Sequence, residues 1–395
     1  MAHSLKLPNA SGNIEAYTLR GTNPVQAAAG VKFNRIAYSA AHVVADPLAA
    51  IDPWLQCAVD WDATIAYRQR LWSLGLGVAE AMDTAQRGMG LDWPTSLELI
   101  RRSLDAAKDV PGALVASGCG TDHLVPENVK TVDEVIAGYE EQMAAIEKLG
   151  GKLIVMASRA LARVARSPAD YERVYDRILS QARQPVVLHW LGDMFDPALK
   201  GYWGSIDTDR AMDTALAVIA AHPDNVDGIK ISLLDKEKEI AMRRRLPRGV
   251  RMYTGDDFNY AELIAGDGWG TETTQGQSDA LLGIFDAIAP AASAALGELA
   301  RGNLQKFHDI LGPTVPLSRH IFAAPTRFYK TGVVFMAWLN GHQRHFTMVG
   351  GQQSTRSLPH FAELFRLADA ANLLEQPELA VHRMKTLLAL HGVNP

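Results

Sequence analysis

The chain has 395 residues, of which 48% are hydrophobic and 21% charged, so it can bury a large core and is not intrinsically disordered. A net charge of -5 argues against a nucleic-acid partner, which would need a basic face. No apolar stretch reaches the about 18 residues that a membrane helix needs, and residues 1–13 lack the apolar core of a signal peptide. The two cysteines, Cys57 and Cys119, fit a reducing compartment, which predicts a cytoplasmic protein.

After an N-terminal arm over residues 1–30, short β-rich runs alternate with longer amphipathic segments. The eight β-rich runs are Arg35–Ser39, Gly77–Glu80, Gly112–Ala116, Lys152–Met156, Pro185–His189, Val226–Ile231, Arg251–Thr254 and Ala280–Phe285. Eight such units in series predict an α/β fold, a (β/α)8 TIM barrel over residues 31–300. A doubly wound open sheet usually has fewer strands and a glycine fingerprint at its first turn, which this chain lacks.

Helix signals stand between the β-rich runs. The segments are Asp60–Leu74, Thr131–Leu149, Ala169–Arg183 and Asp207–Ala221. Thr131 followed by Glu134 predicts a capping box, and Pro168 predicts a first helical turn. From about residue 300 the alternation stops, and residues 303–311, 331–339, 359–371 and 378–391 predict a C-terminal helical extension over residues 301–395.

The run Val226–Ser232 contains a lysine where a buried strand is expected. Period-2 alternation predicts that Val226, Gly228 and Lys230 face the barrel lumen and that the branched residues face the helices. An apolar lumen would lower the pKa of the lysine and leave more neutral amine to attack a carbonyl. The alternative is a strand-end lysine that reaches solvent or pairs with Asp256.

Further polar residues follow the predicted strands, at the end of the barrel where active sites lie. We expect the substrate to contact Glu80, Asp83, Thr121, Asp122, Arg159, Trp190, Asp256 and Asp257. Arg159 could hold a substrate carboxylate or simply cap a helix, and Trp190 could stack on a sugar face or pack in the core. His42 and Asp193 also follow strands.

Four segments together resemble a known superfamily. Gly228-Ile229-Lys230 matches its glycine–hydrophobic–lysine motif, Thr254-Gly255-Asp256-Asp257 its seventh strand and Ser278–Gly283 its eighth, while Ile51–Gly77 is similar to its first helix and second strand. On these residues the chain resembles the dihydrodipicolinate synthase and N-acetylneuraminate lyase superfamily, in a DUF993-type branch. The resemblance implies a barrel with a C-terminal helical extension, an imine between Lys230 and a 2-oxo acid, no cofactor, and a homo-oligomer (dimer or tetramer).

The chain departs from that superfamily at two points. His189 stands where the superfamily has a proton-shuttling tyrosine, and it could do that work or be a satisfied core histidine. Glu80 and Asp83 stand near the place of the loop that holds the keto-acid carboxylate. Two carboxylates there would repel pyruvate and would suit a hydroxyl-rich substrate, because carboxylates accept hydrogen bonds from sugar hydroxyls.

Three functions follow from these patterns. The first is a class I lyase or aldolase in which Lys230 captures a keto acid or a carbohydrate-derived carbonyl, His189 moves the proton, and no metal or organic cofactor takes part. The second is a metal-dependent barrel isomerase, epimerase or hydrolase. Its ligands would come from Glu80, Asp83, His189, Asp193, Asp256 and Glu272. The third is a non-catalytic barrel that binds a metabolite.

Overall fold

The centre of the molecule is a closed barrel of eight parallel strands. A computed structural model describes residues 4–394 except 21–22, 28–31 and 269–275. The strands follow the order β10-β3-β4-β5-β6-β7-β8-β9, so the last strand of the barrel pairs with the first. Their bounds are β3 Ala37–Ala40, β4 Gly77–Glu80, β5 Val115–Cys119, β6 Lys152–Val155, β7 Val186–Leu191, β8 Val226–Ser232, β9 Arg251–Thr254 and β10 Asp279–Leu282. The predicted (β/α)8 barrel is confirmed.

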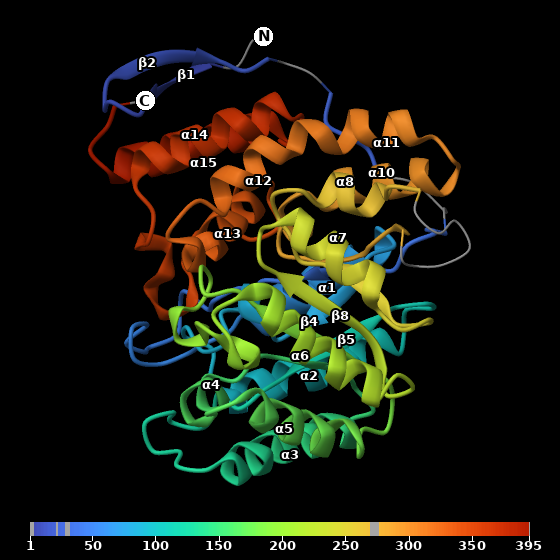
Figure 1. Cartoon of the computed structure of the whole chain (residues 1–395). Coiled ribbons are helices and arrows are strands. Elements are labelled where there is room, and N and C mark those ends of the chain that lie inside the picture. Colours follow the sequence, from blue (N-terminus) through green and yellow to red (C-terminus); the bar gives the residue numbers. More distant parts are fainter. Residues whose placement is uncertain (1–3, 21–22, 28–31, 269–275, 395) are drawn as a thin grey trace.

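Helices surround this barrel (Figure 1). They are α1 Trp61–Ser73, α2 Trp93–Ala107, α3 Val132–Lys148, α4 Arg159–Val164, α5 Pro168–Leu179, α6 Thr208–Ala221, α7 Lys236–Arg245, α8 Tyr260–Ala265, α9 Ile284–Ala287 and α10 Ala289–Ala300. The predicted capping box is present at the start of α3, where Thr131 and Glu134 accept from each other's backbone N–H. Every helix of the described residues is too short or too polar to cross a membrane.

A helical extension continues the chain beyond the barrel. It consists of α11 Leu304–Leu311, α12 Val315–Ile321, α13 Tyr329–Leu339, α14 Leu358–Ala370 and α15 Pro377–Leu390. Helix α13 packs on α9 and on the short 3-10 turn η1, Asp83–Ala85, which follows β4. The extension therefore reaches the carboxyl end of the barrel strands.

The N-terminal arm contains a hairpin that the sequence patterns did not predict. Strands β1 (Ser4–Pro8) and β2 (Ile14–Thr18) pair antiparallel and lie against α14 and α15 at the upper end of Figure 1. The Tyr17 hydroxyl donates a hydrogen bond of 2.6 Å to Asp369, which ties the hairpin to α14. The two ends of the chain thus meet on the same face.

The barrel separates two apolar regions. The larger lies between the strands and the helices, and the smaller fills the lumen. The lumen side chains are Tyr38, Ala40, Ala79, Met82, Ala116, Ile154, Met156, Val187, Tyr253 and Leu281. Because several of them are alanines, the lumen keeps room for polar groups near the carboxyl ends of the strands.

A β-bulge in β8 corrects the predicted facing of this strand. The pairing with β7 shifts so that Val186 opposes Val226 while Val187 opposes Gly228, which leaves Asp227 as the extra residue. Val226 packs among the helices, contrary to the prediction, and Asp227 bonds the Tyr253 hydroxyl at 2.6 Å. Above the bulge the alternation resumes, so Gly228 and Lys230 keep the predicted side.

Candidate active site

Lys230 lies inside the barrel, near the carboxyl end of β8. Its side chain is only 6% exposed, and within the described part of the chain no hydrogen bond or ion pair reaches its amine. Burial lowers its pKa, an effect that the negative charges of Asp257 and Asp83 oppose. The alternative ion pair with Asp256 is absent among the described residues. An unpaired, desolvated amine of this kind is neutral more often than a surface lysine.

Two glycines shape the surroundings of this lysine. Gly228 makes room for a ring, because a Cβ there would come within 2.7 Å of the Tyr253 ring. Gly255, after β9, lies beside the lysine itself, and a Cβ there would come within 2.7 Å of the Lys230 Cε. A side chain at position 255 would therefore displace the amine.

His189 is the neighbour of Lys230 on the adjacent strand. The two residues are paired in register across β7 and β8, and His189 is 1% exposed. Its Nε2 lies 3.3 Å from the Ser232 hydroxyl. Burial, together with the positive charge of Lys230, lowers the pKa of His189 well below its usual value. The imidazole is therefore neutral near pH 7 and can accept a proton.

Asp83 and Asp257 are the two carboxyls that act electrostatically on the lysine amine. Asp257 accepts a 2.9 Å hydrogen bond from the Ile284 N–H, yet burial raises its pKa to about 7. It can therefore hold a proton close to neutral pH. Asp83 begins the η1 turn and faces the open cavity described next.

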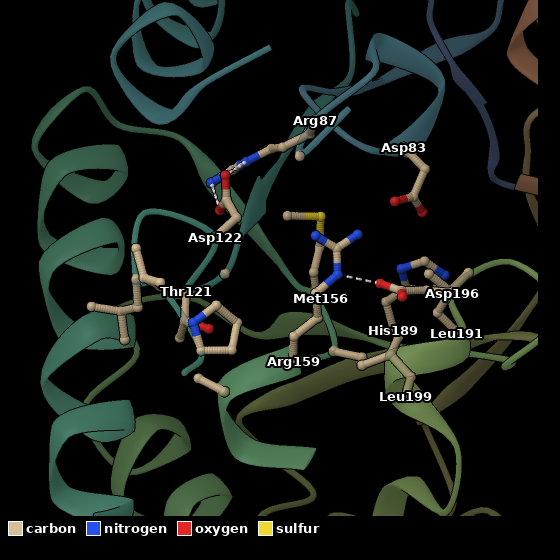
Figure 2. Close-up of a pocket in the computed structure, with 17 residues that line it drawn as sticks. Asp83, Arg87, Thr121, Asp122, Met156, Arg159, His189, Leu191, Asp196 and Leu199 are labelled. Carbon is tan, nitrogen blue, oxygen red and sulfur yellow. Dashed lines mark hydrogen bonds and ion pairs between the residues drawn. The ribbon is translucent and has the colours of Figure 1, made fainter. Parts of the chain in front are cut away.

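A cavity of about 260 Å³ opens over β5, β6 and β7. The polar residues that line it include Asp83, Arg87, Thr121, Asp122, Arg159, His189 and Asp196 (Figure 2). The structure thus brings together five of the predicted site residues, Asp83, Thr121, Asp122, Arg159 and His189. Lys230 does not line this cavity and lies one strand beyond His189, with which it is paired in register.

The two arginines of the cavity differ in how they are bonded. Arg87 donates to both oxygens of Asp122, at 3.0 and 2.7 Å, and also to Gln142 and to the carbonyl oxygens of Ala81 and Gly118. Arg159, the first residue of α4, has one bonded partner in the described part of the chain, the Asp196 carboxylate, which its Nε contacts. Asp122 is therefore engaged by protein, whereas the far end of Arg159 is open to the cavity.

Thr121 is also engaged by protein. Its hydroxyl lies 2.6 Å from that of Ser158, which accepts from the Leu161 N–H and so caps α4. The sequence allows two roles for Arg159, holding a substrate carboxylate and capping a helix. The N-cap of α4 is Ser158, not Arg159.

Besides Lys230 and Asp257, three further predicted site residues do not line the cavity. Glu80 faces the helices, where both of its oxygens accept hydrogen bonds of 2.9 Å from Arg68. Trp190 packs edge to face on Trp203 in the helix layer, with ring centroids 6.4 Å apart. Asp256 accepts from the backbone N–H groups of residues 258 and 259 at the start of α8. Strand alternation explains the first two, since Ala79 and His189, their chain neighbours, occupy the lumen side.

The proposed metal ligands that the structure describes do not form a metal site. Glu80 is paired with Arg68, Asp193 is exposed, and Glu272 lies outside the described residues. In the ranges that the structure describes, no three side chains of His, Cys, Asp or Glu come close enough to hold an ion. His42 is buried with its Nδ1 2.8 Å from Asp286. Burial raises the pKa of the Cys119 thiol to about 12, which disfavours the thiolate at neutral pH.

Sequence reasoning missed Arg87, Asp196 and Lys330. Lys330 comes from α13 and is 4% exposed, with its Nζ 3.0 Å from the Met89 sulfur and 3.1 Å from the Arg327 carbonyl oxygen. It interacts electrostatically with three cavity residues, Asp83, Arg159 and Asp196. No local pattern marks this lysine, since only the packing of the extension on the barrel places it there.

Comparison with solved structures defines the fold. The barrel is similar to dihydrodipicolinate synthase from Aquifex aeolicus (12% identity, 91% of this chain and 99% of that chain, TM-score 0.59). It is also similar to 4-hydroxy-tetrahydrodipicolinate synthase from Methylacidiphilum fumariolicum SolV (14%, 87% and 99%, 0.62). A third similar structure is an E. coli K12 prophage protein of the dihydrodipicolinic acid synthase family, in complex with pyruvate (14%, 92% and 100%, 0.61). The chain therefore has the fold of the dihydrodipicolinate synthases.

Comparison with family models places the chain more narrowly. The model described as "Protein of unknown function (DUF993)" matches residues 5–393. The chain belongs to the DUF993 family. A search of curated proteins finds no match.

Proposed function

We propose that this protein is a class I lyase or aldolase in which the Lys230 amine captures a small carbonyl substrate. The observation that carries the proposal is the buried amine itself, which has no bonded partner among the described residues and stands beside a neutral imidazole. A lysine that served only the fold would be paired or would reach solvent, since an unpaired buried amine costs stability. Stability given up at one position in this way is typical of catalytic groups.

The proposed reaction begins with imine formation. The neutral Nζ bonds to the carbonyl carbon, and the oxygen takes up two protons and leaves as water, which yields an iminium. The adjacent carbon–carbon bond then breaks: its electron pair passes to the iminium and forms an enamine, while the hydroxyl group of the other fragment gives up its proton and that fragment leaves as an aldehyde or ketone. A proton returns to the enamine carbon, and water hydrolyses the iminium to release the product and the free amine.

His189 and Asp257 are the proposed proton carriers. His189 is neutral at pH 7 and lies next to the lysine, so it can accept a proton as the substrate bond breaks. Asp257, with its pKa near 7, can give a proton to the departing water. Both side chains are buried, and groups held in place in this way transfer protons without a prior rearrangement.

Reduction with borohydride in the presence of candidate carbonyl compounds tests the proposal. Borohydride delivers hydride to an iminium carbon and makes the adduct permanent, so we expect the intact mass to rise by the mass of one substrate plus two hydrogen atoms, less the water lost when the iminium forms. Prior treatment with EDTA should leave the yield unchanged. Activity that EDTA removes, with no adduct, would favour the metal-dependent alternative. Reversible binding without turnover or adduct would favour the metabolite-binding barrel.

The Asp257→Asn substitution should shift the pH dependence of adduct formation. The Asp257 carboxylate favours the ammonium form and so raises the pKa of Lys230, which burial alone would set lower. Removing that charge lowers the pKa of the lysine further, and the rise of the trapping rate with pH should move to lower pH. Initial trapping rates measured across about pH 5–10 check this shift, because this interval lies between the reference pKa values of the aspartic acid and lysine side chains.

Asp256→Asn is the matched control for that shift. Asp256 is the adjacent residue and is also buried, but its charge is not among those that act on Lys230. Because Asp256 acts on Asp257 but not directly on Lys230, the pH profile should shift much less in this variant than in Asp257→Asn. A shift to higher pH in Asp257→Asn, or equal shifts in both variants, would contradict the role given to Asp257.

Two properties of the whole protein accompany the proposal. Both cysteines are free, which suits the cytoplasm. The resemblance to barrel lyases that assemble as dimers or tetramers suggests a homo-oligomer.

A further inference from the structure

The cavity contains one guanidinium whose terminal nitrogens have no protein partner. Arg159 uses its Nε on Asp196, and among the described residues nothing accepts a hydrogen bond from its Nη1 or Nη2. Figure 2 shows the guanidinium extending into the cavity, between Met156 and Asp196. The Arg159 Nη1 lies close to Gly88, since a Cβ added at position 88 would come within 3.4 Å of this nitrogen. Two free, coplanar N–H groups of this kind match the two oxygens of a carboxylate or phosphate.

The other arginine of the cavity cannot serve in this way. Arg87 is 5% exposed, and its N–H groups donate hydrogen bonds to Asp122, Gln142 and two backbone carbonyl oxygens. A substrate anion would have to break a bidentate ion pair to reach it. Arg159 is therefore the arginine of this cavity that is available to a ligand.

Lys330 adds a second positive charge near Arg159. Its ammonium bonds a thioether and one carbonyl oxygen, neither of which neutralises it, and its charge acts on Arg159 and on Asp196. Burial lowers its pKa to about 8, so most of it remains charged at neutral pH. Of the charges that act on Lys330, Arg159 and Arg327 are positive and Asp83 and Asp196 negative, so with Lys330 itself the group carries one net positive charge.

The charges that act on the Lys230 amine are negative. Asp83 and Asp257 are the charges that act on it, and neither forms an ion pair with an arginine or lysine of the described chain. A carboxylate bonded directly to the reacting carbonyl would meet these two acids. The charges therefore favour a substrate whose carbonyl end is uncharged and whose anion lies at a distance.

We propose that the substrate carries an oxyanionic group, carboxylate or phosphate, remote from its carbonyl carbon, and that this group binds the free edge of Arg159 with Lys330 in support. This inference rests on the function proposed above for Lys230. It names Arg159 and Lys330 as specificity-determining residues. It also makes a carbonyl compound with a remote anion a better substrate than pyruvate.

Matched aldehydes distinguish the two ends of the site. Glyceraldehyde and glyceraldehyde 3-phosphate differ by a phosphate, and butyraldehyde and succinic semialdehyde differ by a carboxylate remote from the carbonyl. Each is trapped with borohydride over a range of concentrations, and the adduct at Lys230 is quantified. For at least one pair we expect the anionic member to half-saturate at a concentration lower by about tenfold or more. The pair with the larger ratio identifies the anion.

Arg159→Gln should remove this preference, so that the anionic member of each pair half-saturates at about the same concentration as its neutral partner. Lys330→Met should reduce the preference without removing it. Arg163→Gln is the matched control, because Arg163 is an exposed arginine on the same helix outside the cavity. This substitution should change the trapping of neither the anionic nor the neutral aldehyde. Equal trapping of charged and neutral members by the unmodified protein, or equal losses for both in Arg159→Gln, would overturn the inference.

A second measurement separates this inference from the lyase proposal. Binding of inorganic phosphate and of succinate is measured by calorimetry on the unmodified protein and on Arg159→Gln, with no aldehyde present. Arg159-dependent anion binding without any adduct at Lys230 would support the anion site and refute the lyase. Adducts at Lys230 without a difference between charged and neutral aldehydes would do the reverse.

Discussion

Replacing Lys230 by methionine is expected to lower turnover by at least about 10³-fold, because the amine that forms the covalent bond is lost. Methionine keeps most of the length and the apolar stem of lysine, so the barrel should still close around it. The measurement is kcat with the carbonyl substrate that gives the highest adduct yield. Lys236→Met, at an exposed lysine at the start of α7, is the control and should retain full activity.

The same substitution should make the protein more stable at neutral pH. Burial lowers the pKa of Lys230 in the folded state, so folding disfavours the ammonium form that the unfolded chain prefers. Below the unfolded pKa this difference destabilises the fold, and the penalty fades as the pH rises to that value. Thermal unfolding of Lys230→Met should therefore show a higher midpoint at pH 7, with a gain that shrinks towards pH 10, about the unfolded pKa of lysine. A lower midpoint together with unchanged turnover would mean that Lys230 serves the fold.

Breaking the ion pair between Arg68 and Glu80 should cost the most stability. Both side chains are fully buried, with a bidentate contact of 2.9 Å, and Arg68 also donates to the carbonyl oxygen of His42. Glu80→Ala leaves the guanidinium buried without its counter-charge, which is expected to lower the free energy of unfolding by about 3–5 kcal/mol. Chemical denaturation followed by tryptophan fluorescence measures this loss.

The design of that experiment separates ion pairing from packing. In the double variant Arg68→Met with Glu80→Leu, no charge remains buried, and part of the lost stability should return. Glu98→Ala removes a surface partner of Arg101 on α2 and should change stability little. If the single and double variants at positions 68 and 80 lose equal stability, the loss comes from packing and the electrostatic account of this pair is incorrect.

This pair also links stability to the site. Glu80 is the last residue of β4, and the chain reaches Asp83 three residues later. Arg68 therefore holds the end of β4 and, through it, the carboxylate that acts on Lys230. Loss of the pair should lower activity by displacing Asp83, even though Glu80 itself faces away from the cavity.

The barrel could be predicted from the sequence because its signals are local. Eight β-rich runs at regular spacing, with caps such as Thr131 between them, leave few other arrangements. Side-chain facing was harder to predict. Alternation along β7 could have placed Trp190 on the helix side, because its neighbour His189 faces the lumen. No local sequence pattern predicts the bulge in β8 that turns Asp227 into the lumen.

The site was predictable only in part, for a related reason. Lys230 and His189 are neighbours because their strands are, which the order of barrel strands already implies. Lys330 and Lys230 are 100 positions apart in the numbering, and only the packing of α13 on η1 relates that helix to the barrel mouth. The hydrogen bonding of Arg159 likewise depends on the position of Asp196, the N-cap of the short 3-10 turn η2, Pro197–Leu199. Contacts of this range have no periodic signature.

Peptide mapping of the borohydride-reduced adduct tests the central claim most directly. After reduction with the carbonyl compound that raises the intact mass, the digested protein should carry the added mass on the one peptide that contains Lys230. Fragmentation should place it on that lysine. An added mass on Lys330 or spread over surface lysines, with Lys230 unmodified, would contradict the account.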